Sequence, residues 1–316
     1  MKVLVTIDAF KGYEELFKDY DLDFTFKFNK VVRLDDARDA DILLGCVPLE
    51  FLDEMKNLKY VHWGMAGSDT VAKKLKGRNI PLTNSTGTFS LSIAEYMISM
   101  ILYFYKNIYK YAKNQEKHIF HNEGENRSIY GSKVLVIGCG SIGMAFAKKM
   151  HDLGAEVTGI KRTLGEKPDF LKELYSIDKL DDILDNYDIV TMSMPQNDGT
   201  IKLMNKERLA KLKDNAVLVN VGRGTAIDTE SLIEELKKKR IFAALDVYEY
   251  EPVDSSSPLW DLENLLMLPH IAGDNSLSYT RELLRELAID NLNGFLKGEK
   301  LKNIVDFETG YKVSNS

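Results

Sequence analysis

The sequence predicts an α/β protein with parallel sheets, organised as two units. Short apolar runs alternate with amphipathic segments along almost the whole chain, a pattern typical of parallel strands whose connecting helices cover both faces of a sheet. A long helical segment and a polar stretch at 122–132 separate two such series. The length of 316 residues suits one large domain or two ordinary ones, and the two series favour two.

Each series supplies strands and helices in turn. In the first we expect strands at 3–7, 23–28, 42–46 and 60–64 and near Leu82, with helices at 12–19, 34–40, 49–56 and 70–76. In the second we expect strands at 134–137, 156–160, 189–194, 216–221, 242–247 and 265–268, with helices between most of them. A last helix at 279–296 and a short tail are expected to return to the first unit.

One long helix is predicted from about Ser90 to His118, because this stretch contains neither Gly nor Pro and either Ser90 or Ser92 can cap its start. Aromatic side chains nearly circle the helix, so more than one of its faces should be covered. It is either a core helix between two domains or, in addition, the seam of a homodimer. Both interpretations stay open, because large aromatic surfaces are seldom left in water.

Composition and charge exclude several classes of protein. Apolar residues make up 44% and charged residues 28%, which indicates a soluble, core-forming globule, and neither a disordered chain nor a disulfide-stapled miniprotein. A net charge of −6 gives no general attraction to phosphate backbones, so nucleic acid is not an expected partner. No group of His, Cys and carboxylate residues has the spacing of metal ligands, so no metal is expected.

The chain has no feature that favours export or membrane insertion. The longest apolar run, at 97–105, is far shorter than the roughly 20 residues that cross a bilayer. The amino terminus has the pattern of a strand and not of a secretory signal. Two cysteines, Cys46 and Cys139, suit a reducing compartment. We therefore expect a soluble, cytoplasmic protein with no membrane partner.

A glycine motif, Gly138-x-Gly140-x-x-Gly143, stands directly after the strand at 134–137 and opens a helix, and a second strand follows. In such a motif the first glycine makes a tight turn, the second lets the backbone approach a pyrophosphate, and the third lets helix and strand pack closely. The amino terminus of the helix holds the phosphates through its N–H groups and dipole. The complete strand–turn–helix–strand context predicts a dinucleotide site.

The residues after the second strand predict which dinucleotide binds. An NAD site normally carries Asp or Glu here for the ribose 2′-hydroxyl. This chain has Lys161, Arg162 and Thr163, with no carboxylate before Glu166. Two cations and a hydroxyl suit a 2′-phosphate, so we expect NADP, with NAD as the alternative cofactor. A solvated basic loop would explain the same residues without a ligand.

Three further segments each follow a predicted strand, at the sheet edge where open α/β sheets bind ligands. They are 220–224 (NVGRG), 244–252 (ALDVYEYEP) and 268–273 (LPHIAG), and they carry Arg223, Glu251 and His270. Each residue alone has an ordinary structural explanation, but all three are expected on loops around one dinucleotide-binding edge. The other histidines, His62, His118, His121 and His151, lie outside these motifs and are expected to be structural or on the surface.

In this order and spacing, the glycine motif and the three segments resemble the D-isomer-specific 2-hydroxyacid dehydrogenases. The similarity extends over nearly the whole chain and includes the loop at 64–69 and the Ala94-Glu95 pair. The resemblance implies a flavodoxin-like substrate domain at 1–98 and 277–316 and a Rossmann dinucleotide-binding domain at 99–276, both with parallel sheets. Members are typically homodimers joined through the nucleotide domain, which favours the helix at 90–118 as a dimer seam. Where members often carry Trp before the glycine motif, this chain has Phe120.

The resemblance also implies roles for individual residues. Arg223 orients the substrate, His270 is the acid/base, and Glu251 holds the imidazole and favours its charged form. This agrees with the chemistry, because reducing a 2-oxoacid needs a hydride donor, a cation for the carboxylate and carbonyl oxygen, and an acid for the developing alkoxide. From the other domain, Ala66 and Gly67 would bind the substrate carboxylate through their N–H groups, and Met65 would shape the pocket. Asp246 would lie near the nicotinamide carboxamide. The expected cofactor contacts are Gly138, Gly140, Ser141, Ile142, Gly143, Lys161, Arg162, Thr163, Pro195, Thr200, Val221, Gly222, Asp246 and Gly273.

The sequence thus favours an NADPH-preferring reductase of small 2-oxoacids, of the glyoxylate, hydroxypyruvate or pyruvate type, which forms D-2-hydroxyacids. One alternative keeps this chemistry and uses NADH. Another is a dinucleotide-sensing binding protein, because corepressor relatives of this fold serve partner recognition.

Overall fold

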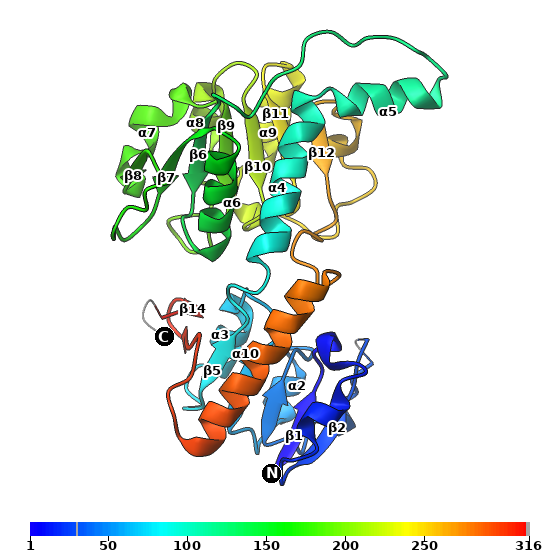
Figure 1. Ribbon diagram of the computed structural model, residues 1–316, viewed down its shortest axis with the longest axis vertical. Helices are drawn as coiled ribbons and strands as arrows, with labels where there is room; N and C mark the ends of the chain where they lie inside the picture. Colours follow the sequence, from blue (N-terminus) through cyan, green and yellow to red (C-terminus); the bar gives the residue numbers. More distant parts are fainter. Residues whose placement is uncertain (30, 314–316) are drawn as a thin grey trace. The chain divides into compact units, whose positions relative to one another are not determined.

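Parallel strands form the centre of both units into which the chain folds (Figure 1). The computed structural model describes residues 1–29 and 31–313. The first unit contains Met1–Phe89 and the chain from Asp274 onward, and the second unit contains Ser90–Gly273. The divisions at 89/90 and 273/274 differ slightly from the expected 98/99 and 276/277. The helix that begins at Ser90 packs against a helix of the second unit, so it belongs to that unit from its start.

The first unit is built on a five-stranded sheet with the order β2-β1-β3-β4-β5, in which every neighbouring pair is parallel. This is the flavodoxin-like order, so the fold predicted for this unit is confirmed. Its strands are β1 (Lys2–Val5), β2 (Asp23–Phe26), β3 (Ile42–Leu44), β4 (Tyr60–Trp63) and β5 (Leu82–Asn84). Its helices are α1 (Leu34–Ala37), α2 (Phe51–Glu54), α3 (Asp69–Leu75) and α10 (Ser278–Lys297), and two short antiparallel strands, β13 (Val305–Asp306) and β14 (Tyr311–Lys312), follow them.

The helix expected at 12–19 is not an α-helix. The chain instead forms two short 3₁₀ helices, η1 (Asp8–Phe10) and η2 (Glu14–Phe17). Within 12–19 only Phe17 is fully buried, where its ring packs against Phe10 and Phe24 at centroid distances of 4.9 and 4.8 Å. A segment with a single buried side chain lacks the recurring apolar face that stabilises an α-helix.

The second unit is built on a seven-stranded parallel sheet with the order β12-β11-β10-β9-β6-β7-β8. Counted from β6, this is the Rossmann order extended by one strand, and it confirms the predicted fold. Its strands are β6 (Lys133–Ile137), β7 (Glu156–Ile160), β8 (Glu173–Tyr175), β9 (Ile189–Met192), β10 (Val217–Asn220), β11 (Phe242–Leu245) and β12 (Leu265–Met267). The sequence did not predict β8, because it is a three-residue edge strand whose side chains are at most half-buried.

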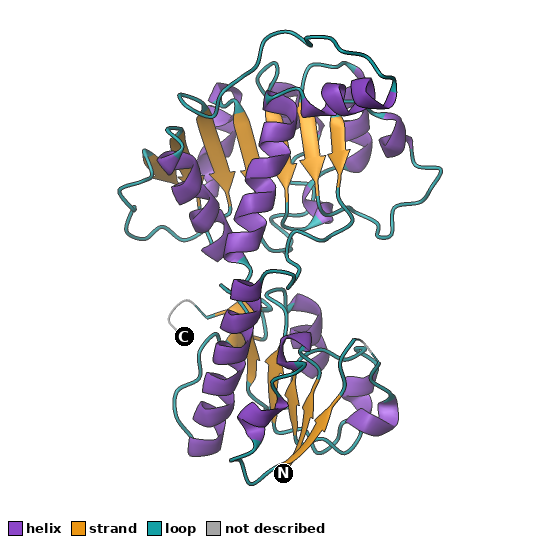
Figure 2. Ribbon diagram, turned by 45° about the vertical axis from the view of Figure 1, so that its right-hand side comes forward, coloured by secondary structure: helices purple, strands orange, loops and turns teal. Residues whose placement is uncertain are grey.

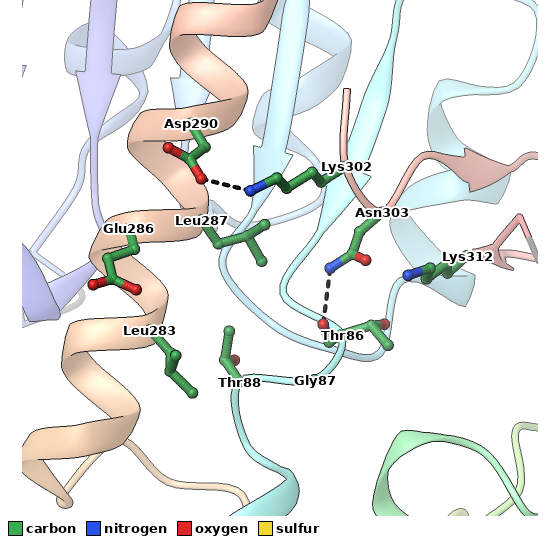
Figure 3. A pocket seen from close by; sticks show the side chains of 10 residues that line it. All are labelled: Thr86, Gly87, Thr88, Leu283, Glu286, Leu287, Asp290, Lys302, Asn303 and Lys312. Atoms are coloured by element: carbon green, nitrogen blue, oxygen red, sulfur yellow. Dashed lines mark hydrogen bonds and ion pairs between the residues drawn. The ribbon is translucent and has the colours of Figure 1, made fainter. Parts of the chain in front are cut away.

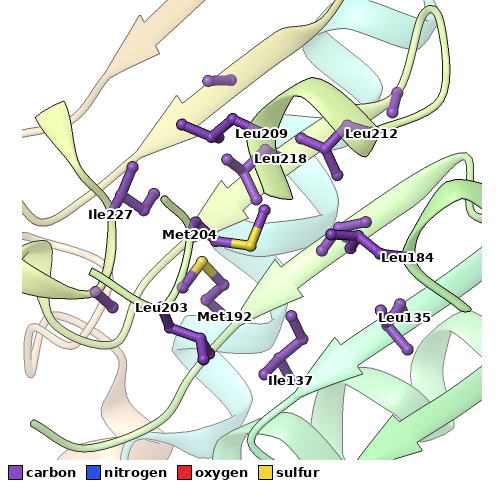
Figure 4. Close-up of a cluster of buried hydrophobic side chains, with 14 of the residues drawn as sticks. Leu135, Ile137, Leu184, Met192, Leu203, Met204, Leu209, Leu212, Leu218 and Ile227 are labelled. Carbon is purple, nitrogen blue, oxygen red and sulfur yellow. The ribbon is translucent and has the colours of Figure 1, made fainter. Parts of the chain in front are cut away.

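Helices cover both faces of this sheet (Figure 2). They are α4 (Ser90–Tyr105), α5 (Ile108–Glu116), α6 (Ser141–Asp152), α7 (Leu180–Ile183), α8 (Lys206–Lys211) and α9 (Thr229–Lys237), with 3₁₀ turns η3 (Ile177–Lys179), η4 (Leu184–Asn186), η5 (Gly224–Ala226) and η6 (Pro258–Asp261). Helices α4 and α6 pack against each other. Helices α8 and α9 contribute buried side chains to a hydrophobic core that also contains every second residue of several strands. Leu135, Met192 and Leu218 of the strands and Leu209 of α8 all belong to that core (Figure 4).

The long helix expected from Ser90 to His118 is two helices. Asn107 adopts a left-handed conformation with φ of 53°, and its N–H bonds to Phe104, three residues back, instead of four. This ends α4, and α5 begins at Ile108. Aromatic packing continues across the break, because Phe104 contacts both Tyr109 and Phe242, at centroid distances of 5.6 and 4.9 Å. No helix in the described part of the chain is both long and apolar enough to cross a membrane.

Candidate active site

The carboxyl ends of the second unit's strands form one continuous row. The strand register pairs Ile160 with Ile137, Ile137 with Met192, Met192 with Asn220, Asn220 with Leu245 and Leu245 with Met267. The residues that the sequence predicted for the site of this unit follow this row closely, at 138–143, 161–163, 195–200, 221–223, 246–251 and 270–273. The sheet therefore brings segments that are far apart in the sequence to a single edge, where parallel α/β sheets bind ligands.

The glycine loop has the backbone geometry of a phosphate-binding turn. Gly138 has a φ of 101°, and a Cβ atom there would lie 2.9 Å from the backbone nitrogen of Met194. A Cβ at Gly143 would lie 2.2 Å from the carbonyl oxygen of Gly138, so α6 packs closely on the turn. Gly140, by contrast, is exposed and faces open space. Backbone can therefore approach a ligand at Gly140, whereas Gly138 and Gly143 serve the turn itself.

Helix α6 begins just where such a ligand would lie. Gly140 is its N-cap and offers no side chain to the first turn, and the first amide that bonds within the helix is that of Met144, to the carbonyl of Gly140 at 2.9 Å. The amides of Ser141, Ile142 and Gly143 have no acceptor within the helix. Free N–H groups and the positive end of the helix dipole suit a pyrophosphate.

The basic segment after β7 is supported by the strand that the sequence did not predict. The N–H of Lys161 donates to the carbonyl of Tyr175 in β8, at 3.0 Å. The side chain of Lys161 is half-buried, whereas Arg162 and Thr163 are exposed. Cys139, within the glycine loop, is buried, and burial raises the pKa of its thiol to about 11. That thiol is therefore protonated at neutral pH and acts as a small filler of the turn.

The loops after β9 and β10 are in close contact. A Cβ at Gly222 would lie 2.7 Å from the carbonyl oxygen of Met194. The hydroxyl of Thr200 donates to the carbonyl of Pro195 at 2.8 Å, which closes the loop after β9. Val221 is buried, and Gly273 lies 3.4 Å, measured from its would-be Cβ, from the side chain of Ile93. Gly222 and Thr200 are thus held by close contacts to the backbone of the loop after β9.

Arg223 stands on a turn that a buried amide shapes. The side chain of Asn220 donates to the carbonyl of Arg223 at 3.0 Å and accepts the N–H of Gly222 at 3.0 Å. One guanidinium nitrogen of Arg223 donates to the carbonyl of Gly222 at 2.9 Å. A Cβ at the next residue, Gly224, would lie 1.9 Å from the carbonyl carbon of Tyr248, so the arginine turn rests directly on the loop that follows β11.

His270 and Glu251 form a hydrogen-bonded pair. The Nδ1 atom of His270 lies 2.8 Å from Oε2 of Glu251, and Oε1 of Glu251 accepts the N–H of Tyr248 at 2.8 Å. About half of the histidine side chain, 52%, is exposed to solvent. When Nδ1 carries the proton that it shares with the carboxylate, Nε2 is the ring nitrogen that remains for a ligand. The pair therefore has the geometry of an oriented acid/base group.

Asp246 anchors the loop that carries the histidine. Its carboxylate is buried and accepts the N–H groups of Ile271 and Ala272, at 2.8 and 3.1 Å. Burial raises the pKa of Asp246, although these two N–H groups oppose the rise. The sequence predicted a place beside the cofactor for this residue, and the structure adds this backbone contact. The hydroxyl of Tyr248 lies 2.9 Å from the carbonyl oxygens of both Leu245 and Leu268, which share its single hydrogen.

In the first unit, the loop after β4 carries the residues predicted to bind a substrate carboxylate. The carbonyl of Met65 accepts the N–H of Ser85 at 3.0 Å, and that of Ala66 accepts the side-chain amide of Asn84 at 2.9 Å. The side chain of Met65 is 48% exposed, and Ala66 and Gly67 are half-buried. Sequence reasoning missed Asn84 and Ser85. The available signal was their position at the carboxyl end of β5, where Asn84 is the last strand residue and Ser85 follows it.

Comparisons with known proteins decide the family. Residues 98–272 match the model of the D-isomer specific 2-hydroxyacid dehydrogenase NAD binding domain, which is more than half of the chain. The chain belongs to this dehydrogenase family. It is 30% identical over 288 residues to a glyoxylate reductase of Thermofilum pendens, covering 87% of this chain and 84% of that one. It is 29% identical to glyoxylate/hydroxypyruvate reductase B of Erwinia tasmaniensis, covering 86% of this chain and 87% of that one. Its structure is similar to a D-isomer specific 2-hydroxyacid dehydrogenase from Xanthobacter autotrophicus Py2, solved with NADPH and MES, with a TM-score of 0.81, 26% identity and coverage of 98% and 99% of the two chains.

Membership of the D-isomer specific 2-hydroxyacid dehydrogenases makes the protein an oxidoreductase with a domain for NAD-type dinucleotides.

The residues predicted for catalysis and cofactor binding do not line either of two pockets on the described surface. One, of about 390 Å³, lies in the first unit between α10 and the loop after β5, with Leu283, Asp290, Lys302 and Asn303 in its wall (Figure 3). The other lies along α5 and the residues that follow it, up to Asn122. Neither contains a residue predicted for catalysis or for cofactor binding. Within the described residues, no three His, Cys, Asp or Glu side chains are grouped as a metal site.

Proposed function

We propose that this dehydrogenase is an NADPH-preferring reductase of small 2-oxoacids, of the glyoxylate, hydroxypyruvate or pyruvate type, and that it forms D-2-hydroxyacids. The observation that carries the proposal is the hydrogen bond between His270 and Glu251, on the same strand-end row as the glycine loop. The names of the relatives, glyoxylate reductase and glyoxylate/hydroxypyruvate reductase, support this substrate class.

The dinucleotide, when bound, supplies the hydride. The chain binds the dinucleotide at two places. The glycine loop and the first turn of α6 bind the pyrophosphate, and Lys161, Arg162 and Thr163 bind the 2′-phosphate. The NADPH complex of the Xanthobacter relative supports the choice of NADPH. Contacts to the rest of the cofactor come from the remaining residues of the strand-end row, namely Pro195, Thr200, Val221, Gly222, Asp246 and Gly273.

Four groups of the chain act on the oxoacid. His270 donates a proton from Nε2 to the carbonyl oxygen as negative charge develops there, and Glu251 keeps the ring oriented through its contact with Nδ1. Arg223 places a cation beside the carboxylate and the carbonyl oxygen. The N–H groups of Ala66 and Gly67 bind the carboxylate. Together these groups stabilise the negative charge of the transition state, and the proton from His270 completes the product hydroxyl.

The experiment is a spectrophotometric assay at 340 nm with glyoxylate, hydroxypyruvate and pyruvate, each with NADPH and with NADH. We expect turnover of at least one oxoacid and a higher kcat/KM with NADPH, and chromatography on a chiral column should identify the D-hydroxyacid wherever a stereocentre forms. A marked preference for NADH would contradict the 2′-phosphate site. Tight binding of NADPH without turnover of any oxoacid would contradict the enzymatic proposal and favour a dinucleotide sensor.

We also propose that the protein works as a homodimer in the cytoplasm, joined through its second unit. Helix α5 contains no buried side chain, and Ile108, Ile119 and Phe120 in and after it are 48%, 49% and 108% exposed. A second copy of this chain covering these side chains would remove them from water. The two cysteines of the chain suit a reducing compartment.

A further inference from the structure

Two residues at the carboxyl end of β5, Asn84 and Ser85, fix the backbone of the loop after β4. The side-chain nitrogen of Asn84 donates to the carbonyl of Ala66 at 2.9 Å, and the N–H of Ser85 donates to the carbonyl of Met65 at 3.0 Å. The hydroxyl of Ser85 also donates to the carbonyl of Trp63 at 3.1 Å. Three carbonyls of residues 63–66 are therefore turned toward the segment 84–85.

This arrangement determines where the loop's N–H groups point. In a planar trans peptide the C=O and N–H bonds point in opposite directions. The carbonyl of Met65 and the N–H of Ala66 belong to one peptide, and the carbonyl of Ala66 and the N–H of Gly67 belong to the next. Because both carbonyls point toward 84–85, both N–H groups point away from it. In the described part of the chain neither N–H has an acceptor, so the loop presents two adjacent donors, a geometry suited to an anion.

Hydrogen bonds fix both the oxygen and the nitrogen of the Asn84 side chain. It is completely buried, and its side-chain oxygen accepts the N–H of Thr86 at 3.1 Å. Its side-chain nitrogen also donates to the hydroxyl of Ser68 at 2.9 Å, and Ser68 in turn donates to the carbonyl of Gly310 at 2.8 Å. The amide plane of Asn84 therefore cannot rotate without breaking several hydrogen bonds in a buried site, which is costly.

A second asparagine fixes the segment that carries Asn84. The side-chain nitrogen of Asn303 donates to the carbonyl of Thr86 at 2.8 Å (Figure 3). It also donates to the carbonyl of Asn84 at 3.2 Å, and the carbonyl of Asn303 accepts the N–H of Asn84 at 3.2 Å. The chain after α10 thereby supports the loop after β5, which supports the loop after β4. All of these contacts lie within the first unit.

We infer that Asn84 is a positioning residue for carboxylate recognition: its amide holds the carbonyl of Ala66 so that the N–H groups of Ala66 and Gly67 face the substrate. This inference rests on the proposed function, which assigns the substrate carboxylate to those two N–H groups. Asn84 does not touch the substrate in this scheme. Ser85 has a smaller part, because its bond to Met65 comes from its backbone and remains when the side chain is removed.

The test compares four variants. Asn84→Ala removes the bond to Ala66 and leaves a cavity, whereas Asn84→Asp keeps the shape and the acceptor for Thr86 but loses the donor to Ala66. Ser85→Ala keeps its backbone donor. The matched control is Asn291→Ala in the same unit, because Asn291 is also a buried asparagine, bonded to the backbone of Lys302 at 2.7 and 3.1 Å and not to the loop after β4.

For each variant we would measure kcat and KM for the accepted oxoacid, the affinity for NADPH, and the binding of oxalate by calorimetry. Losing well-oriented donors to a charged group should raise KM and weaken oxalate binding about tenfold or more in both Asn84 variants. The affinity for NADPH should not change. Ser85→Ala should have a much smaller effect, and Asn291→Ala should lower the thermal midpoint without raising KM.

The inference fails if either Asn84 variant folds, judged by circular dichroism, and binds oxalate and substrate as the wild type does. It also fails if Asn291→Ala raises KM as much as Asn84→Ala, because a general loosening of the unit would then explain the effect. If the wild type turns over no oxoacid, the proposed function fails, but oxalate binding by the same variants still decides whether Asn84 orients an anion site.

Discussion

His270 and Glu251 are joined by a 2.8 Å contact between Nδ1 and Oε2, while the second carboxylate oxygen of Glu251 accepts the N–H of Tyr248. The carboxylate is thus fixed at both oxygens, and the imidazole is fixed through it. The histidine loop is held independently by the buried carboxylate of Asp246. An acid/base group that is oriented before the substrate arrives loses little entropy when it reacts.

Replacing the two members of this pair should separate their roles. His270→Gln removes the proton donor, so kcat/KM should fall by about 10²- to 10⁴-fold. Glu251→Gln keeps a hydrogen-bonding side chain but loses the charge, and we expect a smaller fall of about 10- to 100-fold. Steady-state rates with the accepted oxoacid and NADPH measure kcat/KM for both variants. Fluorescence titration of NADPH is the control and should be unchanged, and wild-type rates in either variant would contradict the role assigned to it.

Arg223 supplies a guanidinium whose shape matters as well as its charge. Arg223→Gln should lower kcat/KM by about 10²-fold or more, because the cation beside the developing negative charge is lost. Arg223→Lys should recover only part of that loss, since an ammonium cannot form two parallel hydrogen bonds to a carboxylate. The measurement is kcat/KM for both variants, with NADPH affinity as the control. Equal activity of the Lys variant and the wild type would exclude a bidentate role.

The strands could be predicted from the sequence because those of both sheets are mostly buried on two faces and appear as apolar runs. The runs continue beyond the hydrogen-bonded ladders, however. Met194, Val221 and Val247 are buried, yet β9, β10 and β11 end before them. Apolar character reports burial and not strand pairing, so the expected strands were too long. The break at Asn107 could not be predicted in this way either, because an asparagine enters a left-handed conformation without a sequence signal as clear as Gly or Pro.

The candidate site, like the fold, could be predicted from the sequence only in part. The glycine loop and the segments of Arg223, Glu251 and His270 could be located because each directly follows an apolar strand and carries an unusual set of residues. Asn84 could not be assigned a role, because its contribution is a hydrogen bond to the carbonyl of Ala66, a residue of a different loop. Backbone direction becomes visible only when the two loops are placed side by side.

Cofactor preference should depend on the two cations after β7, Lys161 and Arg162. In the variants Arg162→Ser and Lys161→Ser, KM for NADPH should rise about tenfold each, because a charged hydrogen bond to the 2′-phosphate is lost. KM for NADH should change little. Lys167→Ser is the matched control, since its ammonium donates to the carbonyl of Leu171 at 2.7 Å and is not assigned to the phosphate. A parallel rise of KM for both cofactors would argue against a 2′-phosphate site here.

The homodimer should depend on the apolar side chains after α5. The double variant Ile119→Asp with Phe120→Asp places two charges where we propose that a second copy packs, so it should elute as a monomer. Light scattering coupled to size-exclusion chromatography measures the mass directly. Leu16→Asp, at a 42% exposed leucine of the first unit, is the control and should leave the dimer intact. A dimer that survives the double variant would place the interface elsewhere.

His62 should make the first unit sensitive to mildly acidic pH. Its ring is fully buried, where Nδ1 lies 2.9 Å from the hydroxyl of Thr83 and Nε2 lies 3.4 Å from that of Ser85, and burial lowers its pKa to about 3. In the unfolded chain its pKa returns to about 6.5. As the pH falls below 6.5 the unfolded state therefore binds up to one proton more than the folded state, and the free energy of unfolding falls, by up to about 1.4 kcal/mol per pH unit.

Urea unfolding at pH 6.5 and at pH 5 measures this dependence above the range in which carboxylates titrate. The wild type should lose about 2 kcal/mol of unfolding free energy between these two values, whereas His62→Gln, which cannot titrate, should lose much less. The comparison concerns the difference between two pH values, so a constant destabilisation by the substitution does not affect it. Equal losses in the two proteins would mean that His62 is protonated in the folded state, and hence that its hydroxyl neighbours or water stabilise the charge despite its burial.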